Sequence, residues 1–169
     1  GEDIICLNGV SQSMAMWFSF LQRFASRYRI TLFDFPPQGK ARINSGGYPL
    51  SLDEEARILG AVITQLNIKS ATICSASWGG VVALKFALDF PQYVKRLIMA
   101  SIGMQPNFRM RDTILKGVAM DKDRRQDMAQ LLINSFGDNL PKIIKEQITA
   151  QFKTMSDEGL RAFGEHGMS

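Results

Sequence analysis

The segment Cys-Ser-Ala-Ser-Trp-Gly-Gly at residues 74–80 decides the fold of this chain. An apolar run typical of a buried strand leads into it at residues 71–74, and an amphipathic helical pattern leads out of it. Ser75 and Gly79 are small, so the backbone on either side of Ser77 can form a very tight turn between strand and helix. Such a turn presents the serine hydroxyl toward a substrate. The segment therefore predicts Ser77 as a nucleophile, although Ser75 replaces the first glycine of the usual Gly-x-Ser-x-Gly pattern.

A simpler interpretation is that the Ser77 hydroxyl only caps the helix that follows, because serine is a favoured capping residue. The loop after the first apolar run, Asn-Gly-Val-Ser at residues 8–11, favours the nucleophile instead. Acyl transfer needs two backbone donors for the developing oxyanion, one directly after the nucleophile and one in a loop that follows an earlier strand. We therefore expect the backbone N–H groups of Val10 and Trp78 to form an oxyanion hole. The other three residues of the loop are expected to contact the substrate: Asn8, Gly9 and Ser11.

Apolar runs and helical patterns alternate along residues 1–105. Four apolar runs predict strands, of which the first two are continuous enough to be buried on both faces: residues 4–7, 28–33, 71–74 and 96–100. Three segments with apolar residues at helical spacing predict helices: residues 16–24, 52–66 and 79–90, the last ended by Pro91. Ser51 and Glu54 form a predicted capping box before the second helix. Strands that alternate with helices predict a doubly wound α/β sheet, mostly parallel, with right-handed crossovers.

From residue 106 onward the sequence shows helical patterns and no strand candidate. Helices are expected around residues 128–136, from Pro141 to residue 152, and around residues 156–163. Several of the nine methionines lie in this region or at its entrance and could line a groove for an acyl chain or fill ordinary helix contacts: Met99, Met104, Met110, Met120, Met128 and Met155. The chain is thus expected to consist of an α/β part at residues 1–105 and an all-helical part at residues 106–169.

The order of these segments resembles the amino-terminal half of the α/β-hydrolase fold. Three short motifs also resemble those of bacterial acyltransferases that take 3-hydroxyacyl chains from acyl carrier protein: Leu7-Asn8-Gly9, Phe33-Asp34-Phe35-Pro36 followed by Gly39, and Ser75-Ala76-Ser77-Trp78-Gly79-Gly80. Such enzymes include the synthase of the rhamnolipid precursor 3-(3-hydroxyalkanoyloxy)alkanoate and the 3-hydroxyacyl carrier-protein:coenzyme A transacylase. The resemblance implies an acyltransferase or esterase that forms an acyl-Ser77 intermediate from a small acyl ester or thioester. It also implies a helical cap at residues 106–169 and acyl carrier protein as a candidate partner. Lys40 and Arg42 could contact that partner or only keep their loop soluble.

The resemblance further implies a catalytic acid and a histidine after the nucleophile. The only histidine, His166, lies in the helical region rather than after a final strand, so a surface histidine is its simpler interpretation. Nearby acids are poor candidates for the same reason: Asp157, Glu158 and Glu165. We therefore expect the C-terminal core strands, with the acid and the histidine, to lie outside this chain. The sheet, with its strands in the order second, first, third, fourth, would then have bare apolar edges through which chains could associate.

Two other functions stay open at this point. A non-catalytic member of the fold would keep the Ser77 turn and bind a ligand or a partner without a base. A carboxylester hydrolase of unknown substrate would share the acyl-enzyme, and only the access of water or of another acceptor would distinguish it from a transferase. A Rossmann-type nucleotide site is not predicted, because no Gly-x-Gly-x-x-Gly pattern follows the first strand.

Composition and charge are those of an ordinary globular protein: of 169 residues, 46% are hydrophobic and 21% are charged. Cys6 and Cys74 lie in apolar runs and predict buried thiols, which suits a reducing cytoplasm. The net charge of +4 comes from Lys and Arg interleaved with Asp and Glu, a pattern that does not predict nucleic-acid binding. No apolar stretch is long enough to span a bilayer, and no metal or cofactor site is predicted.

Overall fold

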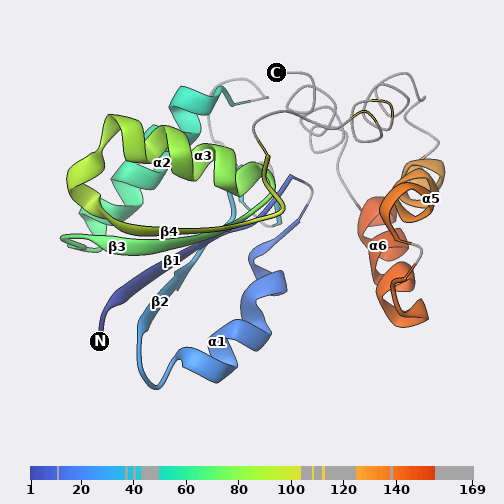
Figure 1. Ribbon diagram of the computed structural model, residues 1–169, viewed down its shortest axis with the longest axis horizontal. Coiled ribbons are helices and arrows are strands. Elements are labelled where there is room, and N and C mark those ends of the chain that lie inside the picture. The colour runs from blue at the N-terminus through green and yellow to red at the C-terminus, as the bar shows by residue number, and fades with distance from the viewer. Residues whose placement is uncertain are drawn as a thin grey trace. The chain divides into compact units, whose positions relative to one another are not determined.

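The computed structural model describes residues 1–10, 12–36, 38–39, 41–42, 50–103, 108, 112, 125–137 and 139–154. The chain divides into two compact units, Gly1–Ile102 and Gly103–Ser169. The first unit holds a sheet with helices, and the described part of the second unit is helical (Figure 1).

The first unit is built on a sheet of four parallel strands (Figure 1). Their bounds are β1 Asp3–Leu7, β2 Arg29–Leu32, β3 Ala71–Ala76 and β4 Val94–Ala100. The order across the sheet is β2-β1-β3-β4, and Ile5 of β1 is paired with Thr31 of β2 and with Ile73 of β3. Each strand connects to the next through a helix, so this order confirms the predicted doubly wound α/β sheet.

α1 (Phe18–Phe24) covers one face of the sheet, and α2 (Leu52–Gln65) and α3 (Trp78–Asp89) cover the other (Figure 1). A short 3-10 helix, Met14–Trp17, leads into α1. One buried cluster joins the strands to the α1 side: Ile4, Cys6 and Cys74, with Trp17, Phe20, Tyr28, Ile30 and Leu32. A larger cluster joins them to α2 and α3 and includes Ile5, Leu7, Ile73, Ala56, Leu59, Ile63, Val82, Ala83 and Phe86. Alternate residues of β1 therefore point to opposite, covered faces.

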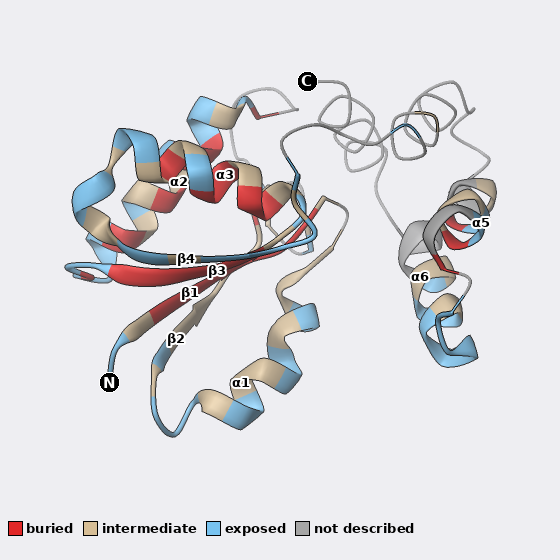
Figure 2. Cartoon of the chain, in the orientation of Figure 1, coloured by how far each residue is buried: buried red, intermediate tan, exposed pale blue. Residues whose placement is uncertain are grey.

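The two strands at the edges of this sheet are less buried than the two in the middle (Figure 2). In β2, Arg29 is exposed and the other residues are only partly buried, so the expectation that this strand is buried on both faces is wrong. β4 leaves 56% of Ile98 and 39% of Met99 exposed. Within the described residues each edge strand has one neighbour, so its outer flank is uncovered. Association of chains through these edges stays a prediction.

The boundaries of α2 and α3 follow local signals. The Ser51 hydroxyl accepts a hydrogen bond from the Glu54 N–H (3.3 Å), and the Ser51 N–H donates to the Glu54 carboxylate (2.8 Å), which confirms the capping box. α3 begins at Trp78, one residue before its predicted start, and ends at Asp89. The chain then enters a 3-10 helix, Pro91–Tyr93, because proline cannot continue an α-helix.

The described part of the second unit contains two α-helices, α5 (Arg125–Phe136) and α6 (Lys142–Thr154), in the two regions predicted for them. Pro141 precedes α6 instead of being its first residue, and its carbonyl accepts hydrogen bonds from the N–H groups of Ile144 (3.0 Å) and Lys145 (3.2 Å). The helix predicted around residues 156–163 lies outside the described residues. In the described parts of both units, no helix combines the length and the apolar character needed to cross a membrane.

Candidate active site

Ser77 lies at the turn between β3 and α3, and its backbone is strained. β3 continues to Ala76, so Ser77 follows the strand directly. Its φ of 50° and ψ of −124° lie outside the regions that non-glycine residues favour, a conformation that costs about 1–3 kcal/mol. The Ser77 N–H donates to the Ala100 carbonyl of β4 (2.9 Å), and the Ser77 carbonyl accepts from the Gly80 N–H (2.8 Å). These bonds tie the strained residue to β4 and to α3.

The hydroxyl of Ser77 is not used to cap α3. Ser77 occupies the residue position before the helix, yet its side chain makes no capping hydrogen bond, and the residue is exposed. A capping residue also has an extended backbone, whereas Ser77 has a positive φ. The interpretation of Ser77 as only a helix cap is therefore wrong. An exposed hydroxyl on a strained strand-to-helix turn is the geometry that a serine nucleophile needs.

Two glycines allow the loop after β1 to pack against this turn. A Cβ at Gly79 would lie 2.6 Å from the Leu7 carbonyl oxygen and 2.7 Å from the Asn8 carbonyl oxygen, closer than side chains approach backbone. A Cβ at Gly9 would lie 3.1 Å from the Cβ of Ser77. Position 79 needs glycine because no Cβ fits between the two backbones there, whereas the atom closest to a Cβ at position 9 would be the Gln12 side-chain oxygen, at 2.7 Å. The structure thus brings the loop after the first strand and the Ser77 turn together.

Val10 and Trp78, the predicted oxyanion donors, follow Gly9 and Ser77 in the chain. Val10 is partly buried, and Trp78 is the first residue of α3, where backbone N–H groups point out of the helix end. The Gly9 N–H donates to the Gln12 side-chain oxygen (2.9 Å), so that amide is engaged within its own loop. The positive end of the α3 dipole favours negative charge beside it. The pairing of the two N–H groups as an oxyanion hole stays a prediction.

Asn8 stabilises the loop that carries Val10. Its side-chain Nδ2 donates to the Gln12 carbonyl (3.1 Å) and to the Gln38 side-chain oxygen, and the residue is buried. The Asn8 Oδ1 is buried and accepts no hydrogen bond from the described residues. Substrate contact by Asn8 and Gly9 stays a prediction, and Ser11 lies outside the described residues.

Asp34 holds the segment that follows β2. Its Oδ1 accepts a hydrogen bond from the Met14 N–H (2.6 Å) at the start of the 3-10 helix. Gly39 has a φ of 52°, and a Cβ there would lie 1.9 Å from the Asp34 Oδ2. These two residues of the segment that carries the resemblance therefore close the turn after β2. Of the two basic residues in this loop, Arg42 donates to backbone carbonyls of the loop itself, and Lys40 lies outside the described residues.

A buried carboxyl group lies beside the Ser77 turn, and the sequence patterns did not single it out. Glu55 of α2 is 1% exposed, and its Oε2 accepts a hydrogen bond from the indole Nε1 of Trp78 (2.7 Å). Burial raises the pKa of Glu55 to about 7, because desolvation outweighs the hydrogen bond from Trp78. Glu55 lies three residues after Leu52 and four before Leu59, on the buried stripe of α2. A carboxyl group on an apolar stripe is the signal that could have identified it.

The candidates for the other members of a catalytic triad cannot be placed next to Ser77. His166 and the three acids near it are outside the described residues: Asp157, Glu158 and Glu165. Among the residues that are described, no group of three or more His, Cys, Asp or Glu side chains could hold a metal. Cys6 and Cys74 are buried free thiols that lie opposite each other on the neighbouring strands β1 and β3. The Cys74 thiol and burial raise the pKa of Cys6, so this thiol stays protonated at neutral pH.

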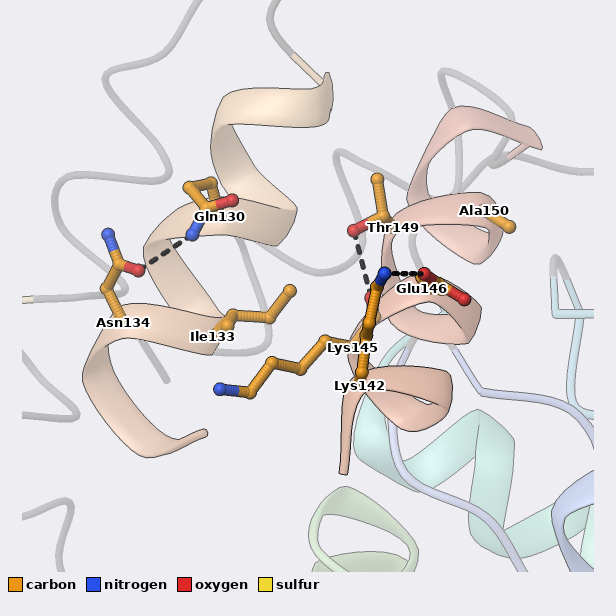
Figure 3. Close-up of a pocket in the computed structure, with 8 residues that line it drawn as sticks. All are labelled: Gln130, Ile133, Asn134, Lys142, Lys145, Glu146, Thr149 and Ala150. Atoms are coloured by element: carbon orange, nitrogen blue, oxygen red, sulfur yellow. Dashed lines mark hydrogen bonds and ion pairs between the residues drawn. The ribbon is translucent and has the colours of Figure 1, made fainter. Parts of the chain in front are cut away.

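A cavity of about 500 Å³ lies between α5 and α6 in the second unit (Figure 3). Its lining comes from both helices: Gln130, Ile133, Asn134, Lys142, Lys145, Glu146, Thr149 and Ala150. Two pairs of polar side chains of the lining interact within one helix: Gln130 donates a hydrogen bond to Asn134 (2.7 Å), and Lys142 forms an ion pair with Glu146 (3.8 Å). The cavity contains none of the predicted site residues.

The chain matches the family model described as alpha/beta hydrolase fold over residues 4–140. It is 29% identical to a (R)-3-hydroxydecanoyl-ACP:CoA transacylase of Pseudomonas putida, over 84% of this chain and 48% of that protein. It is 26% identical to a pimeloyl-(acyl-carrier protein) methyl ester esterase of Nitrosospira multiformis, over 94% of this chain and 57% of that protein. The chain thus spans about half the length of these curated relatives. The transacylase confirms the resemblance to enzymes of 3-hydroxyacyl carrier protein.

Solved structures show the same fold. A hydrolase from Oleispira antarctica superposes with a TM-score of 0.82 at 14% identity, over 98% of this chain and 65% of that one. An alpha/beta hydrolase enzyme from a deep-sea metagenome library superposes with a TM-score of 0.77 at 18% identity, over 99% of this chain and 63% of that one. Relatives with named activities are hydrolases and acyltransferases. The parallel sheet, the Ser77 turn and these matches lead to one conclusion: the chain belongs to the α/β-hydrolase fold family.

Proposed function

We propose that the protein is a serine enzyme of acyl transfer, an acyltransferase or an esterase, that forms an acyl-Ser77 intermediate. The Ser77 Oγ attacks the carbonyl carbon of an acyl ester or thioester while its proton passes to a base. The bond from that carbon to the alcohol or thiol breaks, and the leaving group takes up a proton. Water, or the hydroxyl or thiol of an acceptor, then attacks the acyl-serine and regenerates Ser77.

The observation that carries this proposal is the exposed, uncapped hydroxyl of Ser77 on a positive-φ backbone. Strain of this kind persists only where the surrounding structure enforces it, and it is concentrated at functional sites. Here the carbonyl of Ala100 and the N–H of Gly80 both bond to the strained residue. The strain, the absence of a capping hydrogen bond and the position directly before α3 together support a chemical role.

Negative charge on the carbonyl oxygen of the substrate needs donors close to Ser77. We assign this role to the backbone N–H groups of Val10 and Trp78. Two observations support the assignment: a Cβ added at Gly9 would lie 3.1 Å from the Cβ of Ser77, so this loop passes close to the nucleophile, and Trp78 begins a helix of 12 residues whose amino end attracts negative charge. No histidine is present among the described residues, so we assign no base for the Ser77 proton.

Acyl chains carried by acyl carrier protein are the substrates we propose, with 3-hydroxyacyl chains as the first choice. The names of two relatives mention acyl carrier protein, one as a transacylase and one as an esterase. Acyl transfer and ester hydrolysis by a serine nucleophile share an acyl-enzyme and differ in what removes the acyl group. In this proposal the helical region at residues 106–169 is the cap that limits the access of water.

Labelling by a fluorophosphonate tests the nucleophile in the full-length gene product. We expect wild-type protein to be labelled at Ser77 and Ser77→Ala to lose all labelling, because the probe needs an activated serine. Ser70→Ala is the matched control: Ser70 is exposed and precedes β3, at the opposite end of the strand that Ser77 follows. Labelling that persists in Ser77→Ala, or wild-type protein that is never labelled, would overturn the proposal.

Turnover of two substrates separates transfer from hydrolysis. The same protein is assayed with 3-hydroxydecanoyl carrier protein plus coenzyme A, and with p-nitrophenyl butyrate. Formation of 3-hydroxydecanoyl-coenzyme A supports the transferase. Turnover of the p-nitrophenyl ester alone, with no reaction of the carrier protein, removes the transferase and leaves an esterase.

A further inference from the structure

A hydrogen bond joins α2 to the residue directly after the proposed nucleophile. The indole N–H of Trp78 donates to the carboxyl group of Glu55 over 2.7 Å, although the two residues lie 23 positions apart in the chain. Figure 1 shows α2 and α3 together on one face of the sheet, and the contact lies where α3 begins. Glu55 is 1% exposed, so the bond is shielded from water and is stronger than it would be at the surface.

A carboxyl group at this position is unfavourable for the fold alone. Burial disfavours its ionised form and raises the pKa of Glu55 to about 7. The neighbouring buried positions of α2 are apolar: Ala56, Leu59 and Ile63. Positions that break a local rule in this way occur preferentially at functional sites. Glu55 therefore calls for an explanation that the packing of α2 does not provide.

The explanation lies in what Trp78 connects. Its backbone follows Ser77, whose own N–H and carbonyl are tied to Ala100 and Gly80. Its side chain packs against the core cluster shared by α2, α3 and the sheet. The bond to Glu55 adds a directional constraint at the far end of the indole, so the side chain and the backbone of Trp78 are fixed from both sides.

We propose that Glu55 is a positioning residue: by accepting the hydrogen bond of the Trp78 indole, it fixes the backbone N–H of Trp78 toward the oxyanion that forms at Ser77. The inference rests on the proposed role of Ser77 as nucleophile. Glu55 itself does not contact the reacting atoms in this mechanism. It acts through Trp78, and a small displacement of that residue is enough to lower the rate, because misplacement by about 1 Å can cost about 100-fold.

Kinetics of three variants of the full-length gene product test this role with p-nitrophenyl butyrate. Glu55→Leu has a similar size and no acceptor, and we expect it to lower kcat about 10- to 100-fold with KM within about threefold of wild type. Glu55→Gln keeps an acceptor oxygen, and we expect it to recover most of that loss. Trp78→Phe keeps the backbone N–H and removes the indole donor, so it should lower kcat about 10-fold. The double variant that combines Trp78→Phe with Glu55→Leu should have a kcat no lower than that of the slower single variant, because both substitutions remove the same hydrogen bond.

Ile63→Ala is the matched control, because Ile63 is buried on the same side of α2, about two turns from Glu55. It destabilises the helix and should leave kcat within about twofold of wild type while the protein is folded. A folded Glu55→Leu variant with wild-type kcat overturns the positioning role. If Glu55→Leu does not fold, Trp78→Phe decides in its place, and wild-type kcat in that variant has the same meaning. Equal loss in Glu55→Gln and Glu55→Leu also overturns it.

Amide hydrogen exchange separates this inference from the proposed function. In folded Glu55→Leu protein, the amides of residues 78–80 should exchange at least about tenfold faster than in wild type. In the control Ile63→Ala, the same amides should exchange at the wild-type rate. This readout needs no activity. Faster exchange in a protein that is never labelled at Ser77 means that the proposed function fails and that Glu55 still holds the turn. Unchanged exchange overturns the positioning role even if Ser77 is labelled.

Discussion

Two neighbouring strands of the sheet end in the same way and lead into different surroundings. β3 is followed by Ser77 with a φ of 50°, and β4 is followed by Ser101 with a φ of 55°; both serines are exposed. At Ser77 the next turn of chain is α3, and Gly79 lets that helix pack on the loop after β1. Ser101 is followed by Ile102, whose Cδ1 would lie 2.9 Å from a Cβ added at Gly80.

A positive φ at an exposed serine therefore does not by itself indicate a nucleophile. Both serines have a positive φ and a glycine two positions later, so what distinguishes Ser77 is the Gly9 loop beside it and the helix that begins directly after it. The two turns are also linked, since the Ser77 N–H donates to the carbonyl of Ala100, the residue before Ser101. The end of β4 therefore acts as a support for the turn after β3.

Among the substitutions near Ser77, Gly79→Ala is expected to have the largest effect on stability. A Cβ there would collide with two backbone carbonyls, at 2.6 Å and 2.7 Å, and backbone cannot move aside as a side chain can. We expect the free energy of unfolding to fall by about 4 kcal/mol, measured by denaturant unfolding. Gly60→Ala in α2 is the control, because its Cβ would meet Phe86 at an ordinary 3.6 Å. That variant should gain up to about 1 kcal/mol from helix propensity, and equal losses in both variants would contradict the packing argument.

The second largest expected effect is a pH dependence of stability that comes from Glu55, which lies beside the Ser77 turn and not beside Ser101. Burial raises the pKa of Glu55 from 4.5 to about 7, so the folded protein keeps this proton where the unfolded chain releases it. The contribution of Glu55 to stability is thus fully present below about pH 4.5, falls as the pH rises toward 7 and is constant above it. The difference amounts to about 3 kcal/mol in the free energy of unfolding.

Denaturant unfolding of wild type and Glu55→Gln between pH 4 and pH 8 measures this difference. The free energy of unfolding of Glu55→Gln minus that of wild type should be about 3 kcal/mol larger at pH 8 than at pH 4. The neighbouring Glu54 provides a control of opposite sign, because hydrogen bonds from the backbone and hydroxyl of Ser51 lower its pKa. Glu54→Gln should lose its effect as the pH falls, and a pH-independent difference for Glu55→Gln would contradict its raised pKa.

The smallest expected effect compares the two serines directly through glycine. Ser77→Gly and Ser101→Gly should each stabilise the protein by about 1 kcal/mol, because glycine adopts a positive φ without a Cβ penalty. Only Ser77→Gly should abolish fluorophosphonate labelling. Thermal unfolding and labelling of both variants check this pair. Stabilisation at Ser101 without stabilisation at Ser77 would mean that the Ser77 turn is not strained.

Much of the first unit could be predicted from the sequence, because the signals are local. The apolar run before residue 74, the helical spacing after Gly79 and the capping pair of Ser51 and Glu54 act over at most four residues, and the structure has the corresponding elements. The error at β2 has a different origin. A continuous apolar run shows that a strand can be buried on both faces, and the neighbours of the strand decide whether it is.

Local sequence patterns are enough to predict the strands and helices of the α/β part, the place of Ser77 between β3 and α3, and the need for small residues around it. The packing of the layers determines that the Ser77 hydroxyl is uncapped and that the Gly9 loop lies beside it. It also determines that a buried Glu55 meets the indole of Trp78. Contacts within a helical turn follow from spacing along the chain, whereas contacts between residues more than 20 positions apart depend on how the layers pack, and no local pattern records that.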